Sequence, residues 1–406
     1  MAKATERIDP RAGSSGGWQM RASTIPIACL AVLLACGGEP TTPVSPADTT
    51  TTQLAIPITG TAVPSMANVD LAISNVMTRW GVPGGAMGIM KDGRLVYARG
   101  FGYADLASQK VATPDALFRI ASVSKPVTKA AILKLVEQGR FSLDAPAFAL
   151  LPQIIPLPGA TVDPRLATIT VRHLLNHSGG WDRAITFDPM FLPNEIAAAT
   201  GTPAPASAEA IVRYMMGKPL SFDPGTRVAY SNFGYAVLGR IIERVTGASY
   251  EQFVKEAVLA PAGVTRMELG RTLYANRLPD EVRYYDLGYA PSVFPGVGLV
   301  PMPYGGFNLE AMDSHGGWVA SVVDLLRFEK MWVAPPAQGY WFHDGGLPGT
   351  VSVMVRTSTG DAWVAVFNAL AMKPNSKFQD EIDDVLRQAV NGVKSWPTHD
   401  LFSTFQ

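Results

Sequence analysis

The chain has 406 residues, of which 47% are hydrophobic and 17% are charged, and its formal net charge is +0. A chain of this length and composition can bury a large core, which argues against a disordered protein. Lysine and arginine form no long cluster that could follow a phosphate backbone, so nucleic acid is not an expected partner.

The N-terminal segment contains both cysteines of the chain, Cys29 and Cys36. An apolar run from Ile25 to Ala35 is too short to span a bilayer as a helix. The run ends in Leu-Leu-Ala-Cys, which resembles the lipobox of bacterial lipoproteins. This resemblance implies that residues 1–36 are a signal region and that Cys36 is lipidated. An ordinary secretory signal is the alternative. Both interpretations predict export to the periplasm or cell surface, and the first adds a lipid anchor in a bacterial membrane.

The next segment, residues 37–65, is rich in threonine and proline and offers little apolar surface to bury. This composition predicts an extended tether between the anchor and a folded body. We therefore expect one folded domain at residues 66–395, followed by a C-terminal tail at residues 396–406.

Hydrophobic periodicity predicts the first elements of this domain. A helix is indicated by four apolar residues at helical spacing: Val69, Ile73, Val76 and Met77. Two apolar stretches then flank Lys-Asp-Gly-Arg at 91–94, which predicts a β-hairpin. The sequence VTKAAILKLVEQGR at 127–140 predicts a second helix that stops near Gly139.

The middle of the chain, from about 145 to 300, shows helical patterns separated by Pro/Gly loops, which predicts an all-helical lobe. Another helix is expected at 319–332. The segments 339–346, 349–360 and 361–370 then predict three consecutive antiparallel strands, and 376–390 predicts a final helix. The predicted fold class is therefore α/β of the α+β type. An antiparallel sheet built from both ends of the chain is flanked by helices and carries the inserted helical lobe.

The sequence RIASVSKPVT at 119–128 places Ser122 three residues before Lys125. Residues at this spacing are neighbours on one face of a helix. A serine becomes a nucleophile when a base takes its proton, and a lysine can serve if burial or nearby positive charge lowers its pKa. The alternative is that Ser122 caps the helix and Lys125 is solvated. The pair alone does not decide between them.

Two further motifs favour the catalytic interpretation. Tyr230-Ser231-Asn232 and His343-Asp344-Gly345 follow the Ser-x-x-Lys motif in that order. The series resembles the penicillin-recognising serine hydrolases, and most closely the branch that holds class C β-lactamases, serine D-peptidases and related esterases. The resemblance covers most of residues 66–395 and implies a β-lactamase/transpeptidase-like fold. It also implies a small-molecule or peptide substrate and a mechanism without metal or cofactor.

The resemblance assigns a role to each residue of the motifs. Ser122 would be the nucleophile and Lys125 its proton acceptor. Tyr230 would act as a base if two nearby cations lowered its pKa, with a buried structural tyrosine as the alternative. The expected substrate-binding residues are Asn232, His343, Asp344 and Gly345. The backbone N–H groups of Ser122 and Gly346 would form the oxyanion hole.

Asp344 departs from the family pattern, which often has a hydroxyl residue at this position. A carboxylate facing the site would repel the carboxylate of a β-lactam or of a D-Ala-D-Ala peptide. If strand alternation turns the side chain away, the effect is small. This departure led us to favour an esterase, an amidase or a D-aminopeptidase over a β-lactamase.

His173 and His177 are four residues apart, a spacing that invites a zinc interpretation. Leu174 occupies the position where a glutamate is expected, and no third ligand is evident, so structural roles are favoured. Trp181, Asp182 and Arg183 are placed at the mouth of the site. The loops at 182–195 and 295–308 are expected to set its shape.

The predicted function is an exported serine hydrolase that acts through an acyl-enzyme on an ester or amide. A small ester or a D-amino acid peptide is favoured over a β-lactam. The alternative is a catalytically decayed protein of the same fold that binds cell-wall peptides or penicillin.

Overall fold

The computed structural model describes residues 56–370 and 372–405. The predicted signal region, Cys36 and most of the predicted tether lie outside these residues. Within them, no helix is both long and apolar enough to cross a bilayer.

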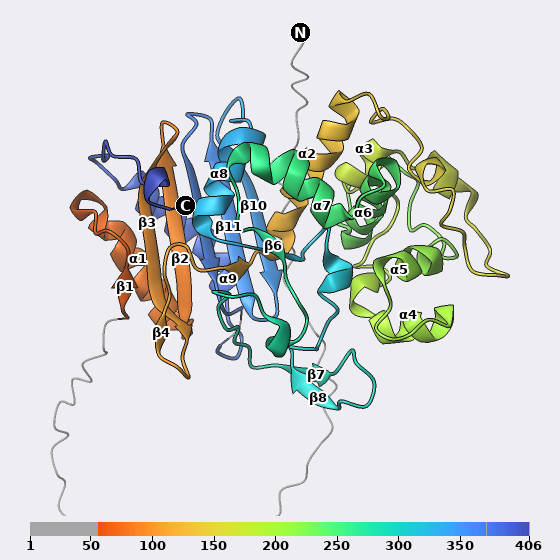
Figure 1. The fold of residues 1–406 in the computed structure, drawn as a ribbon, viewed down its shortest axis with the longest axis horizontal. Coiled ribbons are helices and arrows are strands. Elements are labelled where there is room, and N and C mark those ends of the chain that lie inside the picture. The colour runs from red at the N-terminus through yellow and green to blue at the C-terminus, as the bar shows by residue number, and fades with distance from the viewer. Residues whose placement is uncertain (1–55, 371, 406) are drawn as a thin grey trace, which may run out of the picture. The chain divides into compact units, whose positions relative to one another are not determined.

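The main sheet is built from the two ends of the described chain, as predicted, and is antiparallel (Figure 1). Its strands are β1 (Ile58–Thr59), β2 (Gly84–Lys91), β3 (Arg94–Asp105), β4 (Lys110–Val111), β10 (Tyr340–Leu347), β11 (Thr350–Thr357) and β12 (Ala362–Phe367). They lie in the order β1-β3-β2-β12-β11-β10, and β4 pairs with β3. Strand β10 is therefore an edge strand, and one of its long sides is open.

Tight turns fix the register of the two hairpins. Asp92 and Gly93 form the two-residue turn that joins β2 to β3. Their φ angles of 50° and 76° are both positive, as required in the type of turn whose twist matches that of the strands. Pro348 and Gly349 join β10 to β11 and pair Leu347 with Thr350. Because Pro fixes a negative φ and Gly349 has φ +86°, this is a type II turn.

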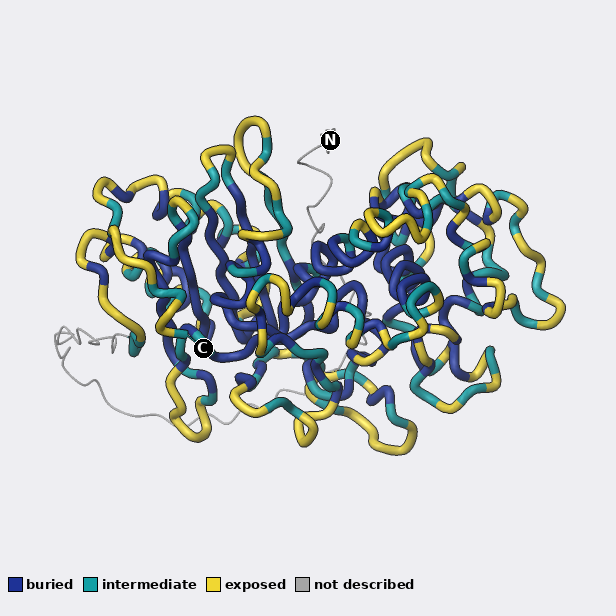
Figure 2. The backbone as a smooth tube through the Cα atoms, turned by 45° about the horizontal axis from the view of Figure 1, so that its top comes forward, coloured by how far each residue is buried: buried dark blue, intermediate teal, exposed yellow. Residues whose placement is uncertain are grey.

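Helices cover both faces of the main sheet. One face packs on α1 (Ala67–Trp80) and α9 (Phe378–Asn391) through Val351, Val353 and Val355 of β11. The other face packs on α2 (Ser124–Glu137) and α8 (Val322–Trp332), and Met354 belongs to that side. This alternation follows from the two-residue period of a strand. Figure 2 shows buried backbone along the central strands and the helices packed on them.

Residues between 145 and 262 are helical, as predicted. The helices are α3 (Val171–Leu175), α4 (Pro193–Thr200), α5 (Ala208–Met215), α6 (Asn232–Thr246) and α7 (Tyr250–Val254). The prediction of an all-helical lobe up to about 300 was too broad. Strands β6 (Glu268–Leu269), β7 (Tyr289–Pro291) and β8 (Leu299–Pro301) lie in its last part. Prolines and glycines between 288 and 306 exclude a helix there.

A second, small sheet positions the segments around Ser122. It has the order β5-β9-β6, in which β5 is Phe118–Arg119 and β9 is Trp318–Ala320. Arg119 pairs with Val319, and Ile120 N–H donates to the carbonyl of Trp318 at 3.0 Å. This pairing brings the turn that carries Ser122 beside the loop that carries His315.

The ordered body extends beyond both boundaries that we predicted. Ile58 pairs with Phe101, so the last residues of the predicted tether form a strand of the main sheet. At the other end, Leu401 N–H donates to the carbonyl of Leu95 at 2.8 Å, and Arg327 donates to the carbonyl of Phe402. These backbone contacts give both segments a defined place that composition did not reveal.

Candidate active site

Ser122 lies in a single turn of 3-10 helix, Ala121–Val123, that leads directly into α2. Ala121 has φ +45°, a left-handed conformation that is uncommon for a residue other than glycine. No side chain caps the start of α2, so Ser122 is not the capping residue of the alternative interpretation. Its side chain instead contacts Lys125 and Tyr230.

Lys125 is 0% exposed and its Nζ contacts three oxygens. Asn232 Oδ1 lies at 2.8 Å, the carbonyl oxygen of His315 at 2.9 Å, and Ser122 Oγ at 3.1 Å. Burial lowers the pKa of Lys125 well below its ordinary value, which favours the neutral amine. A neutral amine has two hydrogens and one lone pair, and the two carbonyl oxygens can only accept. The lone pair is therefore left for the Ser122 hydroxyl, as a general base requires.

Tyr230 donates its phenol hydrogen to Ser122 Oγ at 2.6 Å. Its ring stacks on His177 at 4.7 Å, and the Arg183 guanidinium lies 4.6 Å from the ring centre. Burial nevertheless raises the pKa of Tyr230, and the lowering by Arg183 is smaller. We predicted a lowered pKa from two cations. Burial outweighs the lowering by positive charge, so Tyr230 keeps its proton in the free protein at neutral pH.

Asn232 begins α6, and both ends of its amide are engaged. Its Oδ1 faces Lys125, and its Nδ2 donates to Asp188 Oδ2 at 2.7 Å. Asp188 also accepts from Met190 N–H at 3.2 Å and lies 3.6 Å from Arg183. Asp188 thus fixes which way the Asn232 amide points. In this arrangement Asn232 contacts Lys125, and its contact with substrate stays a prediction.

Sequence reasoning missed Asp188 and His315, because neither belongs to a motif. Asp188 lies in the loop at 182–195, which we singled out only as a determinant of shape. His315 contributes its backbone carbonyl, a group that every residue has, so no sequence signal could have marked it.

The edge strand β10 brings the third motif against Ser122. His343 pairs with Met354 and therefore faces the same side of the sheet as α2. Gly345 faces that side too, and a Cβ placed there would lie 2.9 Å from Ser122 N and 2.5 Å from the Ile120 carbonyl. The strand and the turn approach so closely that only glycine fits. Burial and the neighbouring Lys125 lower the pKa of His343 to about 4, which leaves a neutral imidazole at pH 7.

Asp344 is directed to the opposite side, so it does not face Ser122 as a substrate-binding residue would. It pairs with Val353 on the face covered by α9, and its Oδ2 accepts a hydrogen bond from Gln379 at 3.2 Å. Of the two alternatives stated for Asp344, the structure therefore shows the side chain turned away, and direct repulsion of a substrate carboxylate is not expected. The negative charge of Asp344 nevertheless interacts electrostatically with Lys125 and acts to raise the pKa of that amine.

The open side of β10 presents a backbone N–H group next to the Ser122 turn. In antiparallel strands, hydrogen-bonded pairs alternate with pairs whose N–H groups point outward. Counting from the turn, where Leu347 and Thr350 pair, Gly346 falls at an outward position. Its N–H is thus directed to the open edge next to the Ser122 turn, as the predicted oxyanion hole requires.

The two histidines of the zinc interpretation have contacts within the protein. His173 Nδ1 accepts from Thr170 N–H at 3.3 Å and helps to cap α3. His177 Nδ1 accepts from Ser231 N–H at 3.2 Å, and its ring supports Tyr230. Within 56–370 and 372–405, no three His, Cys, Asp or Glu side chains are grouped as metal ligands.

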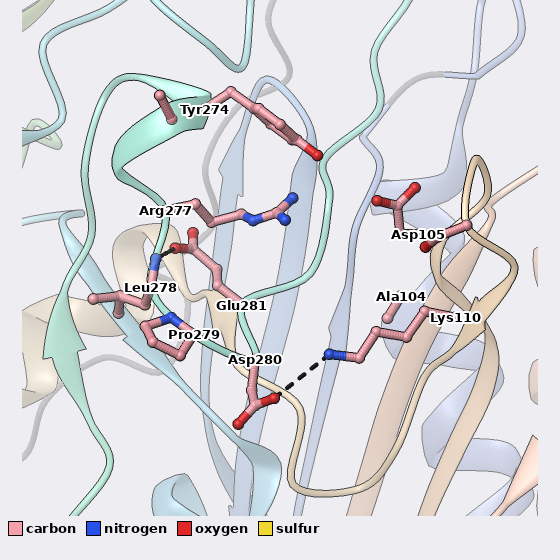
Figure 3. Close-up of a pocket in the computed structure, with 11 residues that line it drawn as sticks. Ala104, Asp105, Lys110, Tyr274, Arg277, Leu278, Pro279, Asp280 and Glu281 are labelled. Carbon is pink, nitrogen blue, oxygen red and sulfur yellow. Dashed lines mark hydrogen bonds and ion pairs between the residues drawn. The ribbon is translucent and has the colours of Figure 1, made fainter.

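A separate hollow of about 460 Å³ lies between the loop after β3 and the segment 274–281 (Figure 3). Three of its charged groups, Asp105, Lys110 and Asp280, form ion pairs. Lys110 lies 3.5 Å from Asp280, and Arg283 lies 3.8 Å from Asp105. None of the three sequence motifs reaches this hollow, so the candidate active site is the group around Ser122.

Comparison with known proteins agrees with this geometry. Residues 69–339 match the sequence profile described as beta-lactamase. The chain is 30% identical over 246 residues to penicillin-binding protein 4* of Bacillus subtilis, which is 59% of this chain and 49% of that protein. It spans about half the length of the curated relatives that it matches.

Solved structures share the fold. The D-amino acid amidase from Ochrobactrum anthropi SV3 aligns with a TM-score of 0.63 and 23% identity, over 82% of this chain and 100% of that one. EstCE1, a hydrolase with promiscuous acyltransferase activity, aligns with a TM-score of 0.59 and 23% identity, over 81% and 99%.

Proposed function

The chain belongs to the beta-lactamase family, and from this premise we propose that it is a serine hydrolase that forms an acyl-enzyme on Ser122. The observation that carries the proposal is the environment of Lys125. Complete burial lowers the pKa of its amine, and the two carbonyl oxygens of Asn232 and His315 orient the amine toward the nucleophile. A solvated lysine would be protonated at neutral pH and could not act as a base.

In the acylation step, Ser122 Oγ attacks the substrate carbonyl carbon and its proton moves to Lys125 Nζ. The carbonyl oxygen becomes an oxyanion held by the N–H groups of Ser122 and Gly346. When the bond to the leaving group breaks, that group takes back a proton, which Tyr230 can relay because its hydroxyl lies 2.6 Å from Ser122 Oγ. Water then attacks the acyl-enzyme with the same groups in reversed roles.

The charge of the site favours uncharged leaving groups. Burial lowers the pKa of both Lys125 and His343, which weakens the positive charge that they offer to a substrate carboxylate. This disfavours β-lactams and peptides that end in D-Ala-D-Ala. It suits a small ester or a D-amino acid amide, and the amidase from Ochrobactrum anthropi supports the second class.

Hydrolysis of p-nitrophenyl butyrate and D-alanine p-nitroanilide by the full chain tests this proposal. We expect turnover of at least one substrate, and a loss of at least about a thousandfold in Ser122→Ala. Ser108→Ala is the matched control, because Ser108 is exposed and lies at the separate hollow. Turnover that survives in Ser122→Ala would show that another group is the nucleophile.

A fluorescent penicillin distinguishes the alternative function. Stable labelling of Ser122 without turnover of any substrate would indicate a binding protein rather than a hydrolase.

We also propose that the protein is exported and anchored by a lipid on Cys36, which rests on the Leu33-Leu34-Ala35-Cys36 pattern. If Cys36→Ser leaves the protein in the membrane fraction of an expressing bacterium, this anchor is excluded.

A further inference from the structure

The β7–β8 hairpin presents an apolar face to solvent. Tyr289 pairs with Pro301 and Pro291 pairs with Leu299, so these four side chains share one face of the hairpin. All four are exposed, and Leu299 at 72% and Tyr289 at 69% are the most exposed large hydrophobic side chains among residues 56–370 and 372–405. The hairpin projects at the lower edge of the body in Figure 1.

The surroundings of this face are equally apolar. Leu287 and Val297, two residues before β7 and before β8, are also exposed, at 51% and 58%. The segment 287–309 contains no Asp, Glu, Lys, Arg or His, although 17% of the chain is charged and a segment of this length would be expected to carry about four such residues. Contiguous exposed apolar surface of this kind marks an interaction site.

Two hydrogen bonds hold the hairpin segment together, and a third joins it to α4. Ser292 N–H donates to the carbonyl of Gly298, and Val293 N–H donates to that of Gly305, both at 2.8 Å. Asn194 Nδ2 of α4 donates to the Ser292 carbonyl at 3.2 Å. These contacts fix the position of the exposed face. The face can therefore contact a partner without first becoming ordered.

The size of the face argues against a second copy of the chain as the partner. Three residues of strand span roughly 10 Å, and two paired strands are about as wide. That backbone footprint is small, and even the accessible surface of the exposed side chains, roughly a few hundred Å², stays below the roughly 800 Å² per partner of a stable interface. A lipid surface sets no such minimum area, and it accepts uncharged apolar side chains with a tyrosine at their edge.

We propose that the β7–β8 face inserts into the interface of a lipid bilayer and orients the body there. The chain outside the described residues makes this geometrically possible. About twenty residues separate Cys36 from Ile56, and fully extended they reach up to about 65 Å. A single lipid-type signal holds a protein only marginally, and a second one makes the attachment stable. The hairpin supplies that second contact, whether the first is the proposed lipid or another.

An environment-sensitive dye on the hairpin tests this proposal in the full chain. Val297→Cys in a Cys29→Ser/Cys36→Ser background gives one attachment site for an NBD label on the exposed face. The control label is placed at Leu71→Cys, which is 62% exposed on α1, away from the hairpin. Vesicles of phosphatidylcholine and phosphatidylglycerol are the probe. We expect a blue shift and a gain in emission for the label at 297 and none for the label at 71.

A second variant separates insertion from other causes. Leu299→Ser, combined with the label at 297, removes the neighbouring apolar side chain and should abolish the shift. Its thermal midpoint should match that of the parent, because Leu299 is exposed. No shift at 297, or equal shifts at 297 and 71, would overturn the proposal. A shift that grows with protein concentration in the absence of vesicles would instead assign the face to a second copy of the chain.

Discussion

At the scale of single residues, the properties of the candidate site depend on burial and on groups outside the motifs as well as on the motif residues. The Ser-x-x-Lys spacing predicted the contact between Ser122 and Lys125. The lowered pKa of Lys125 has another source, namely burial, and the acceptors on Asn232 and His315 only orient the amine. The same burial acts in the opposite sense on Tyr230 and raises its pKa, which sequence could not reveal because depth in the fold is not a local property.

Asp344 shows a second limit of sequence reasoning at this scale. Strand alternation predicts that His343 and Asp344 face opposite sides of β10, but it does not say which of them faces Ser122. The register against β11 decides this, because Met354 opposes His343 on the side of α2. The carboxylate of Asp344 consequently acts on the site only through its charge.

We predict opposite shifts of the pH profile in two charge-neutralising variants. Asp344 acts to raise the pKa of Lys125, and Arg183 acts to lower it. Activity requires neutral Lys125 and therefore falls as pH drops through that pKa. Asp344→Asn should lower the pKa and move the acid limb of kcat/KM to lower pH. Arg183→Gln should raise the pKa and move the limb to higher pH.

The pH dependence of kcat/KM for p-nitrophenyl butyrate measures this acid limb for the free protein. The two variants serve as each other's control, because both neutralise one charge near the same amine. Shifts in the same direction, or none in either variant, would show that Lys125 is not the group whose titration sets the limb.

At the scale of elements, long and strongly periodic segments were predicted and short pairings were not. The hairpin β2–β3, helices α1, α2 and α9, and the strands β10–β12 agree with their predicted segments. Strands β5 and β9 have two and three residues and lie about two hundred positions apart, so no local pattern could pair them. Yet this pairing is what brings the His315 carbonyl to Lys125.

The contact between β10 and the Ser122 turn is tested by Gly345→Ala. The new methyl group would lie 2.5 Å from the Ile120 carbonyl and 2.9 Å from Ser122 N, so the strand or the turn must move. A displacement near 1 Å at reacting groups can cost about a hundredfold, and we expect a loss of that order in kcat/KM. Overpacking should also lower the free energy of unfolding by about 1–3 kcal/mol.

Gly234→Ala in α6 is the control for this prediction. A Cβ at position 234 would meet its nearest neighbour at 3.7 Å, an ordinary contact, so activity should be retained. If Gly345→Ala retained full activity as well, close approach of β10 would not be what positions Ser122.

At the scale of the whole molecule, the core contains a buried ionisable group outside the candidate active site. Glu329 of α8 is 0% exposed, and neither of its carboxyl oxygens has a hydrogen-bond partner in the described part of the chain. Burial raises its pKa well above the ordinary value, and the nearby Arg356 offsets this only in part. Such a group links the stability of the entire fold to pH.

We predict that Glu329→Gln stabilises the protein increasingly as pH rises. Above the unfolded pKa of a glutamate, the unfolded chain releases the proton while the folded protein keeps it, so stability falls with rising pH until the folded pKa is reached. Glutamine has no proton to release, so the difference in unfolding free energy between variant and wild type should grow by up to about 1.4 kcal/mol per pH unit. Chemical denaturation at pH 5, 6.5 and 8 measures this difference in unfolding free energy.

The exposed Glu137→Gln should show no comparable trend. A constant difference for Glu329→Gln would mean that the buried carboxyl is ionised in the folded protein, with Arg356 as its counter-charge.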